Sequence, residues 1–228
     1  MSCNKENLIK STVFFKIYSD ESIRLIYDEI KNIEEDTLWA HHDITHVNNV
    51  VSVTEKVLID MNCDQELIEN AKIAAYMHDV GALQGKSNHA YRSYEFAKRY
   101  FEENSIDLKY KTEVLEAIKN HSEGFDTDNI IQSALIFADK IDIKSSRPTR
   151  AGLMVEGMRQ MQYIDDINVK IDSSTISVNF ICNRNINKQE LEQYYFMKKV
   201  GNSIKSFARK FNLKYNVCFN SNSWEEIL

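Results

Sequence analysis

The chain has 228 residues, of which 43% are hydrophobic and 11% aromatic, so it can bury a sizeable core and does not have the composition of a disordered protein. Its single proline and six glycines predict long helices and a mainly α-helical fold. A net charge of -6 argues against stable binding to nucleic acid or to an anionic membrane, and no apolar run reaches the roughly 20 residues of a membrane span.

Four cysteines are scattered along the chain without C-x-x-C spacing, and no apolar secretory segment follows a charged start. They are Cys3, Cys63, Cys182 and Cys218. We therefore expect reduced thiols in a cytoplasmic protein.

The first 165 residues are expected to form successive helices. After a capping Asp20, one helix extends to Ile33, with an apolar face of Ile23, Leu25, Ile26, Ile30 and Ile33. A second helix begins at about His46 and ends near Met61. Its apolar positions recur at three- and four-residue steps, as a helix that is buried on one side requires.

A third helix, capped by Asp64, leads into the pair His78-Asp79, and Gly81 is available to end it. Adjacent helical residues point about 100° apart. Both side chains of the pair can therefore serve one metal centre only if that centre lies against the end of the helix. We expect His78 and Asp79 to stand at a helix terminus.

Further helices are expected from His89, after a capping Asn88, to about residue 103, and from about residue 108 to 120, just before His121. The segment from 130 to 143 predicts another helix. It carries Asp139 among apolar residues, where a carboxylate needs a partner.

Beyond residue 165 the pattern changes. Residues 167–171 and 175–180 alternate in polarity across a short turn and predict a β-hairpin. Asn187 is expected to cap one long helix to about Lys210, and residues 215–219 predict a third strand. We predict a helical metal-binding domain over residues 1–165 and a small α/β appendage over 166–228 that packs on it.

Six residues repeat the chemistry of metal ligands in an ordered series: His46, His78, Asp79, His89, His121 and Asp139. Six ligands exceed the four of a closed tetrahedral zinc site, and carboxylates can bridge two cations roughly 3.5–4 Å apart. Two divalent cations therefore fit better than one. The mixed shell suits Fe, Mn or Co, while Zn, Ni and Mg remain alternatives.

The segments around these residues resemble the successive motifs of HD-superfamily metal-dependent phosphohydrolases. They are THVNNV, YMHDVGAL, NHAYRSYEFAKRYF, AIKNHSEG and LIFADKID, between residue 42 and about 147. The nearest resemblance is to the dinuclear branch, which includes bacterial hydrolases of symmetrical dinucleoside tetraphosphates. It implies an HD-type helical bundle in which His46, His78, Asp79 and Asp139 are core ligands. The same resemblance implies that His89 and His121 build a second metal site.

The resemblance implies hydrolysis of a phosphate ester or anhydride, in a nucleotide or dinucleotide, by in-line attack of a metal-bridging hydroxide. Asp79 is the catalytic candidate. Basic residues near the motifs could hold the remaining phosphates, with Arg147 ranked above Lys86, Arg92, Lys140 and Arg150. The expected partner is a small phosphorylated substrate, and the appendage could form a homodimer interface.

Alternatives stay open at this point. The centre could be structural, in a non-catalytic sensor or ligand-binding module whose C-terminal element recognises a ligand. A helical scaffold with chance histidines would instead keep its full metal content after His78→Ala. Arg92 could form an ion pair on its own helix, and His41 and His42 could cap a helix or support a ligand.

Overall fold

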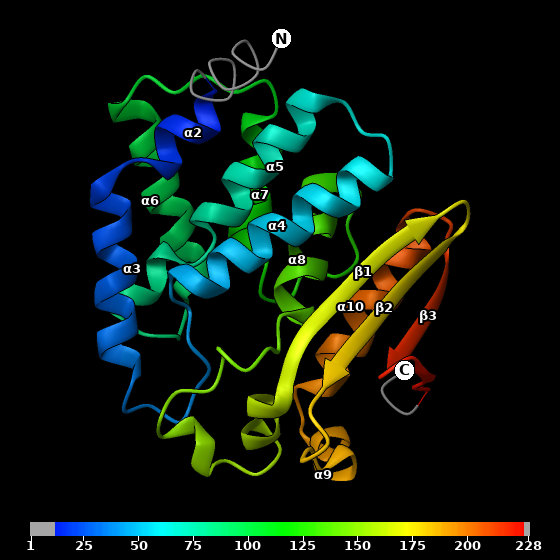
Figure 1. Cartoon of the computed structure of the whole chain (residues 1–228). Coiled ribbons are helices and arrows are strands. Elements are labelled where there is room, and N and C mark those ends of the chain that lie inside the picture. The colour runs from blue at the N-terminus through cyan, green and yellow to red at the C-terminus, as the bar shows by residue number, and fades with distance from the viewer. Residues whose placement is uncertain (1–11, 226–228) are drawn as a thin grey trace, which may run out of the picture.

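The computed structural model describes residues 12–225, which form a helical body flanked by a small sheet (Figure 1). The mainly helical fold with a C-terminal α/β element is as the composition and patterning predicted. Cys63, Cys182 and Cys218 are free thiols. The fourth cysteine, Cys3, lies outside the described residues.

The chain begins with a short helix that we did not predict, α2 (Val13–Tyr18), and continues into the predicted α3 (Glu21–Glu34). Asp20 caps α3 with its carboxylate, as expected. Leu25 and Ile33 are 59% and 46% exposed, so their assignment to the apolar face is wrong. The buried face follows helical steps of three and four residues through Ile23, Tyr27, Ile30 and Glu34.

The other predicted helices of the body are all present. They are α4 (Ile44–Asp60), α5 (Gln65–Met77), α6 (His89–Glu103), α7 (Lys111–Asn120) and α8 (Ile130–Ile141). Helices α4, α5 and α8 pack on one another, and α7 contacts α5, α6 and α8. Asn88 precedes α6 with φ 58°, and its side chain makes no capping hydrogen bond, so the predicted cap is wrong.

Gly81 does not end α5, contrary to the prediction. It lies inside a short 3-10 helix, η1 (Val80–Gln84), which follows Asp79. A Cβ at Gly81 would lie 2.3 Å from the backbone oxygen of His89 and 2.5 Å from the backbone nitrogen of Ser93. Glycine is needed here because the backbones of η1 and α6 are in contact, and this contact holds His89 close to Asp79.

We expect Gly81→Ala to destabilise the protein, because the overlap is with backbone atoms that no side-chain rotation can relieve. Overpacking of this kind costs about 1–3 kcal/mol, or roughly 2–12 °C in Tm for a chain of this size. Gly85→Ala separates overlap from backbone strain, since nothing lies within 4 Å of its Cβ but its φ of 91° is unfavourable for alanine, so any loss of stability there comes from strain alone. Equal Tm values for Gly81→Ala and wild type would contradict this account of the contact.

The predicted hairpin and third strand are confirmed. Strands β1 (Ile164–Asp172) and β2 (Thr175–Cys182) are antiparallel, and β3 (Lys214–Phe219) pairs with β2 in parallel. A two-residue strand that we did not predict, β4 (Asn222–Ser223), completes the order β1-β2-β3-β4. The parallel pair requires a crossover connection, which the helical segment between β2 and β3 provides. The buried side chains of β2 are Ile176, Val178, Phe180 and Cys182.

The single long helix expected from 187 to about 210 is wrong. Two helices, α9 (Lys188–Gln193) and α10 (Met197–Lys210), are separated by three aromatic residues. Tyr194 leaves the helix with an extended backbone of φ -65° and ψ 124°. Its side chain lies so close to Gly157 that a Cβ there would be 2.4 Å from the Cβ of Tyr194. This tertiary packing overrides local helix propensity.

The C-terminal element packs directly on the helical body. The ring centroids of Phe207 on α10 and Phe137 on α8 are 4.7 Å apart. On the other side of the element, the backbone nitrogen of Ile171 in β1 donates to Asp60 of α4 at 3.2 Å. The buried apolar residues of both parts form one continuous cluster. The division of the chain at residue 165 stays a prediction.

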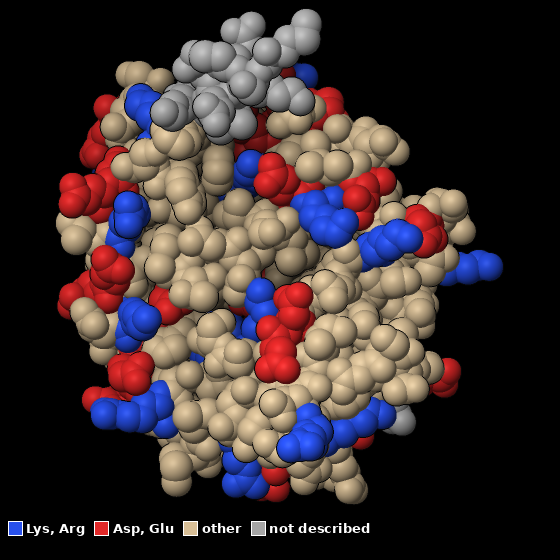
Figure 2. All heavy atoms as spheres, viewed as in Figure 1, with Lys and Arg blue, Asp and Glu red and all other residues tan. Residues whose placement is uncertain are grey.

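Basic and acidic side chains are interspersed over the face shown in Figure 2. Within residues 12–225, no helix is long and apolar enough to cross a membrane.

Candidate metal centre

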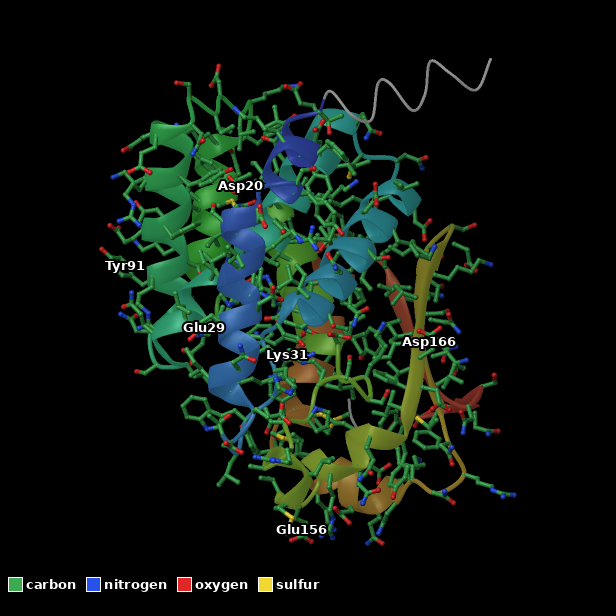
Figure 3. All side chains as sticks on the ribbon, turned by 60° about the vertical axis from the view of Figure 1, so that its left-hand side comes forward. Asp20, Glu29, Lys31, Tyr91, Glu156 and Asp166 are labelled. Atoms are coloured by element: carbon green, nitrogen blue, oxygen red, sulfur yellow. The ribbon has the colours of Figure 1, made fainter. Side chains whose placement is uncertain are left out.

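His46 lies in the first turn of α4, and its position follows from the way the helix begins. The Asp43 carboxylate accepts hydrogen bonds from the backbone nitrogens of Thr45 (3.0 Å) and His46 (3.1 Å). Capping of this type fixes the direction in which a helix starts. The Nζ atom of Lys31 on α3, labelled in Figure 3, lies 3.7 Å from the buried Asp43 carboxylate, although the Lys31 side chain is largely exposed. His46 therefore enters the interior with the buried face of α4.

The remaining predicted ligands also stand at or near helix ends. His78 is the C-cap of α5, and Asp79 leaves the helix with φ -113° and ψ 4°. This departure from helical geometry allows two adjacent side chains to approach one centre, as predicted. His89 begins α6, His121 is the C-cap of α7, and Asp139 lies in the last turn of α8.

Each imidazole of the predicted ligand set is oriented by a hydrogen bond at Nδ1. The partners are Asp142 Oδ2 for His46 (2.7 Å), Ala75 O for His78 (2.7 Å), Lys86 O for His89 (2.8 Å) and Ile118 O for His121 (2.8 Å). Carbonyl and ionised carboxylate oxygens only accept hydrogen bonds, so Nδ1 carries the hydrogen and donates. In the neutral ring the Nε2 lone pair is then free to bind a metal.

These Nε2 atoms surround the carboxylate of Asp79 on two sides. Oδ2 of Asp79 lies 3.0 Å from Nε2 of His78 and 3.5 Å from Nε2 of His46. Oδ1 lies 3.2 Å from Nε2 of His89 and 3.4 Å from Nε2 of His121. Asp139 Oδ1 joins the first group at 3.3 Å from His46. One carboxylate thus separates two groups of ligand atoms.

The ligand atoms are buried and lack partners of their own. Among residues 12–225, Nε2 of His46, Nε2 of His78 and both oxygens of Asp79 have no hydrogen-bond partner. Nε2 of His89 also lies 2.9 Å from Nε2 of His121, although two lone pairs repel at that distance unless a proton or a cation lies between them. Unsatisfied buried polar atoms are costly. The residues therefore fit divalent cations by both donor chemistry and placement.

The charges of the cluster favour cation binding. Burial acts to raise the pKa of Asp79, but the charges of His78 and His42 hold it well below its usual value. Burial also acts to raise the pKa of Asp139, but nearby groups, led by the charge of Lys140, outweigh this effect and the pKa is lowered. Both carboxylates are therefore ionised at neutral pH. Burial lowers the pKa of His121 to about 4, which keeps this imidazole neutral.

Residues 43–149 match the family profile of the HD domain, and all six candidate ligands lie within them. The chain contains an HD domain. No curated protein matches the chain. The crystal structure of a predicted HD superfamily hydrolase from an uncultured Thermotogales bacterium is similar, with 24% identity and a TM-score of 0.44 over 54% of this chain and 68% of that one. The resemblance to the dinuclear branch stays a prediction.

A cavity of about 800 Å³ opens over the candidate metal ligands and includes Asp79, His89, His121 and Asp139 in its lining. Basic side chains also line it: Lys86, Lys119, Lys140, Arg147 and Lys199. This concentration of positive charge in a chain of net charge -6 makes the cavity a suitable site for an anion.

The cavity brings together some of the predicted phosphate-binding residues and leaves two outside. Lys86, Lys140 and Arg147 line it. Arg92 instead donates to backbone carbonyl oxygens of the η1 loop, including Gly81 at 2.9 Å. Arg150 forms an ion pair with Asp36, and the side chains of both partners are exposed.

The sequence analysis did not identify Asp142, which contacts the candidate ligand His46. Its Oδ2 accepts from Nδ1 of His46 at 2.7 Å, and its Oδ1 accepts from Asn49 at 3.2 Å. Lys144 in turn donates to Asn49 at 2.9 Å. The available signal was spacing, because Asp142 follows Asp139 by three residues and a helix places such residues on one face.

Asp142→Asn should weaken metal binding 10- to 100-fold, because the loss of charge weakens the bond that orients His46. Competition with a chelator of known affinity measures the change. Asp166→Asn is the control, since Asp166 lies on β1 (Figure 3), is exposed and does not line the cavity. Unchanged metal affinity in Asp142→Asn would show that His46 does not depend on this contact.

His41 and His42, for which a supporting role was among the options, are both buried. Nδ1 of His42 lies 2.5 Å from Glu34 Oε1, and the ring lines the cavity. Lys119 and Lys199 were not predicted. Lys119 stands two residues before His121, which could have suggested it, whereas no local signal places Lys199 beside residues of the HD domain.

Proposed function

We propose that the protein is a metal-dependent phosphohydrolase that cleaves a phosphate ester or anhydride of a small compound, a nucleotide or dinucleotide, at a centre of two divalent cations. The observation that carries this proposal is the position of the Asp79 carboxylate between two groups of imidazoles. A carboxylate with each oxygen facing a different set of ligands is suited to bridging two cations. The presence of an HD domain supports the hydrolase class.

The two groups of ligands differ in composition. His46, His78 and Asp139 would hold one cation together with Oδ2 of Asp79, and His89 and His121 would hold the other with Oδ1. Imidazole with carboxylate suits Fe or Mn best, with Co, Zn, Ni or Mg as alternatives. When bound, such a pair of cations lowers the pKa of water and neutralises charge on a phosphate.

Residues of the chain would position the substrate. Arg147 is 5% exposed, and its guanidinium donates to the backbone oxygen of His41, so its position is fixed before any ligand arrives. Lys86 and Lys140 lie in the same cavity. Burial first, and then the charge of Arg147, lowers the pKa of Lys86. An anionic substrate would relieve this repulsion between basic side chains. Lys86, Lys140 and Arg147 are therefore suited to hold the phosphate oxygens that the metals leave free.

Elemental analysis of protein purified without added metal, followed by assays on nucleotides, dinucleoside polyphosphates and simple phosphate esters, tests the proposal. We expect about two divalent metals per chain and turnover of at least one compound. His78→Ala should lose metal, which a scaffold with chance histidines would not do. Full metal content without turnover across the panel would instead favour a non-catalytic sensor, and absence of metal would overturn the proposal.

A further inference from the structure

Part of the cavity lining lies outside the HD domain. The junction between α9 and α10 contributes three aromatic residues, α10 contributes Lys199 from its first turn, and η3 (Met158–Tyr163) contributes two methionines. The full set is Met158, Met161, Tyr194, Tyr195, Phe196 and Lys199. The C-terminal element therefore adds an apolar, aromatic surface to a cavity whose HD-domain side carries the candidate metal ligands and most of the basic side chains.

The junction is held in place by polar contacts with η3. The Glu190 carboxylate accepts from the backbone nitrogen of Gly157 (2.8 Å), from Arg159 (2.7 Å) and from Gln160 (2.9 Å). These contacts fix α9 against the loop that leads into η3, where Glu156 is labelled in Figure 3. Gly157 also leaves the space in which Tyr194 packs. The aromatic residues are thus presented by a fixed backbone.

Tyr195 has the geometry of a stacking platform. Its ring is close to perpendicular to its neighbours, at 67° to Tyr194 and 90° to Phe196, so both contacts are edge-to-face. The residue is 63% exposed although it lines the cavity. Within residues 12–225, no other ring stacks in parallel on Tyr195. A planar group entering the cavity could therefore cover it.

Lys199 adds positive charge beside this platform. Its side chain makes no ion pair with any residue of the described part of the chain, 12–225. Lys86, Lys140 and Arg147 line the same cavity as Lys199. These cations therefore act on one region of the cavity. An anion bound there would contact residues from both parts of the chain.

The size of the cavity points to an organic ligand. Its volume of about 800 Å³ lies within the roughly 300–1,000 Å³ of pockets that enclose whole small molecules. The metal ligands and the lysines account for phosphate groups. The aromatic and methionine surface would be left without a function by inorganic phosphate or pyrophosphate alone.

We infer that the C-terminal element forms a subsite for a nucleobase, with Tyr195 stacking on the base and Lys199 binding a phosphate oxygen. This inference rests on the proposed function for the position of the phosphates. The subsite itself is a binding site, so it can be tested without turnover. It also assigns a role to the appendage, which would select substrates by the organic group that they carry.

Two ligands that lack a phosphoanhydride bond and differ only in the nucleoside separate base binding from phosphate binding, provided that both are recovered intact after the titration. They are α,β-methylene-ADP and methylenediphosphonate, titrated calorimetrically into the metal-loaded protein. We expect the adenosine compound to bind at least tenfold more tightly to the wild type. Tyr195→Ala should remove most of that advantage, about tenfold, and change methylenediphosphonate binding less than twofold. Tyr195→Phe should bind both ligands as the wild type does, because stacking is retained.

Lys199→Gln should weaken both ligands by a similar factor, about three- to tenfold, since it acts on phosphate. Tyr215→Ala and Lys198→Gln are matched controls, because both residues are exposed and neither lines the cavity. They should bind both ligands as the wild type does. Equal affinity of the wild type for the two ligands, or an unchanged ratio in Tyr195→Ala, would overturn the subsite. Selective nucleotide binding without turnover of any compound would keep the subsite and overturn the hydrolase proposal.

Discussion

The Asp79→Asn variant is expected to retain at most one of two cations and to lose hydrolytic activity by a factor on the order of 10³ or more. The amide has nearly the shape of the carboxylate but only one oxygen, and its nitrogen cannot bind a metal. Whichever way the amide turns, either the His46 and His78 pair or the His89 and His121 pair faces nitrogen instead of oxygen. The negative charge between the cations is also lost.

Metal content per chain and kcat/KM on the best substrate of the wild type should be measured on the same preparation. Far-UV circular dichroism checks that the variant folds. Asp166→Asn is the matched control, because Asp166 is an exposed carboxylate on β1, and this variant should keep both metals and full activity. Two metals and activity within tenfold of the wild type in Asp79→Asn would refute a bridging role.

The placement of the candidate ligands near helix ends was predictable, because each position has a local cause in the sequence. A helix that begins at Asp43 places His46 in its first turn, and a helix that ends at His78 lets Asp79 turn out of the helical path. Such signals depend on a few neighbouring residues and are therefore visible in the sequence. The predicted helices around these residues were recovered for the same reason.

The cavity could not be predicted because it depends on packing between distant segments. The break at Tyr194 is caused by contact with Gly157, 37 positions earlier in the chain, and not by a helix-breaking residue. The docking of α10 on α8 then brings Lys199 into the cavity that the candidate metal ligands line. Periodicity alone predicted one continuous helix, since no local signal overrules the propensity of the segment.

Removal of the metals should lower the stability of the protein strongly. Metals at this site would bind only the folded chain, so they would stabilise it by about 4 kcal/mol when free metal is a thousandfold above Kd. For a chain of this length this corresponds to roughly 8–16 °C in Tm. Thermal unfolding with and without a chelator measures the difference. His78→Ala, which should bind little metal, is the control and should show almost no chelator effect.

The gap in Tm between the metal-loaded and metal-free forms should widen as pH rises. In the metal-free protein, burial acts to lower the pKa of His46, but the neighbouring carboxylates of Asp139, Asp142 and Asp79 outweigh it and raise the pKa to about 10. The bound proton stabilises the metal-free fold fully below the unfolded pKa of about 6.5, and this contribution is lost as pH rises through about 10. A metal at Nε2 must displace the same proton, so its apparent affinity should increase by up to about tenfold per pH unit from pH 6.5 to 8. A gap that narrows over this range would show that His46 does not exchange a proton for a metal.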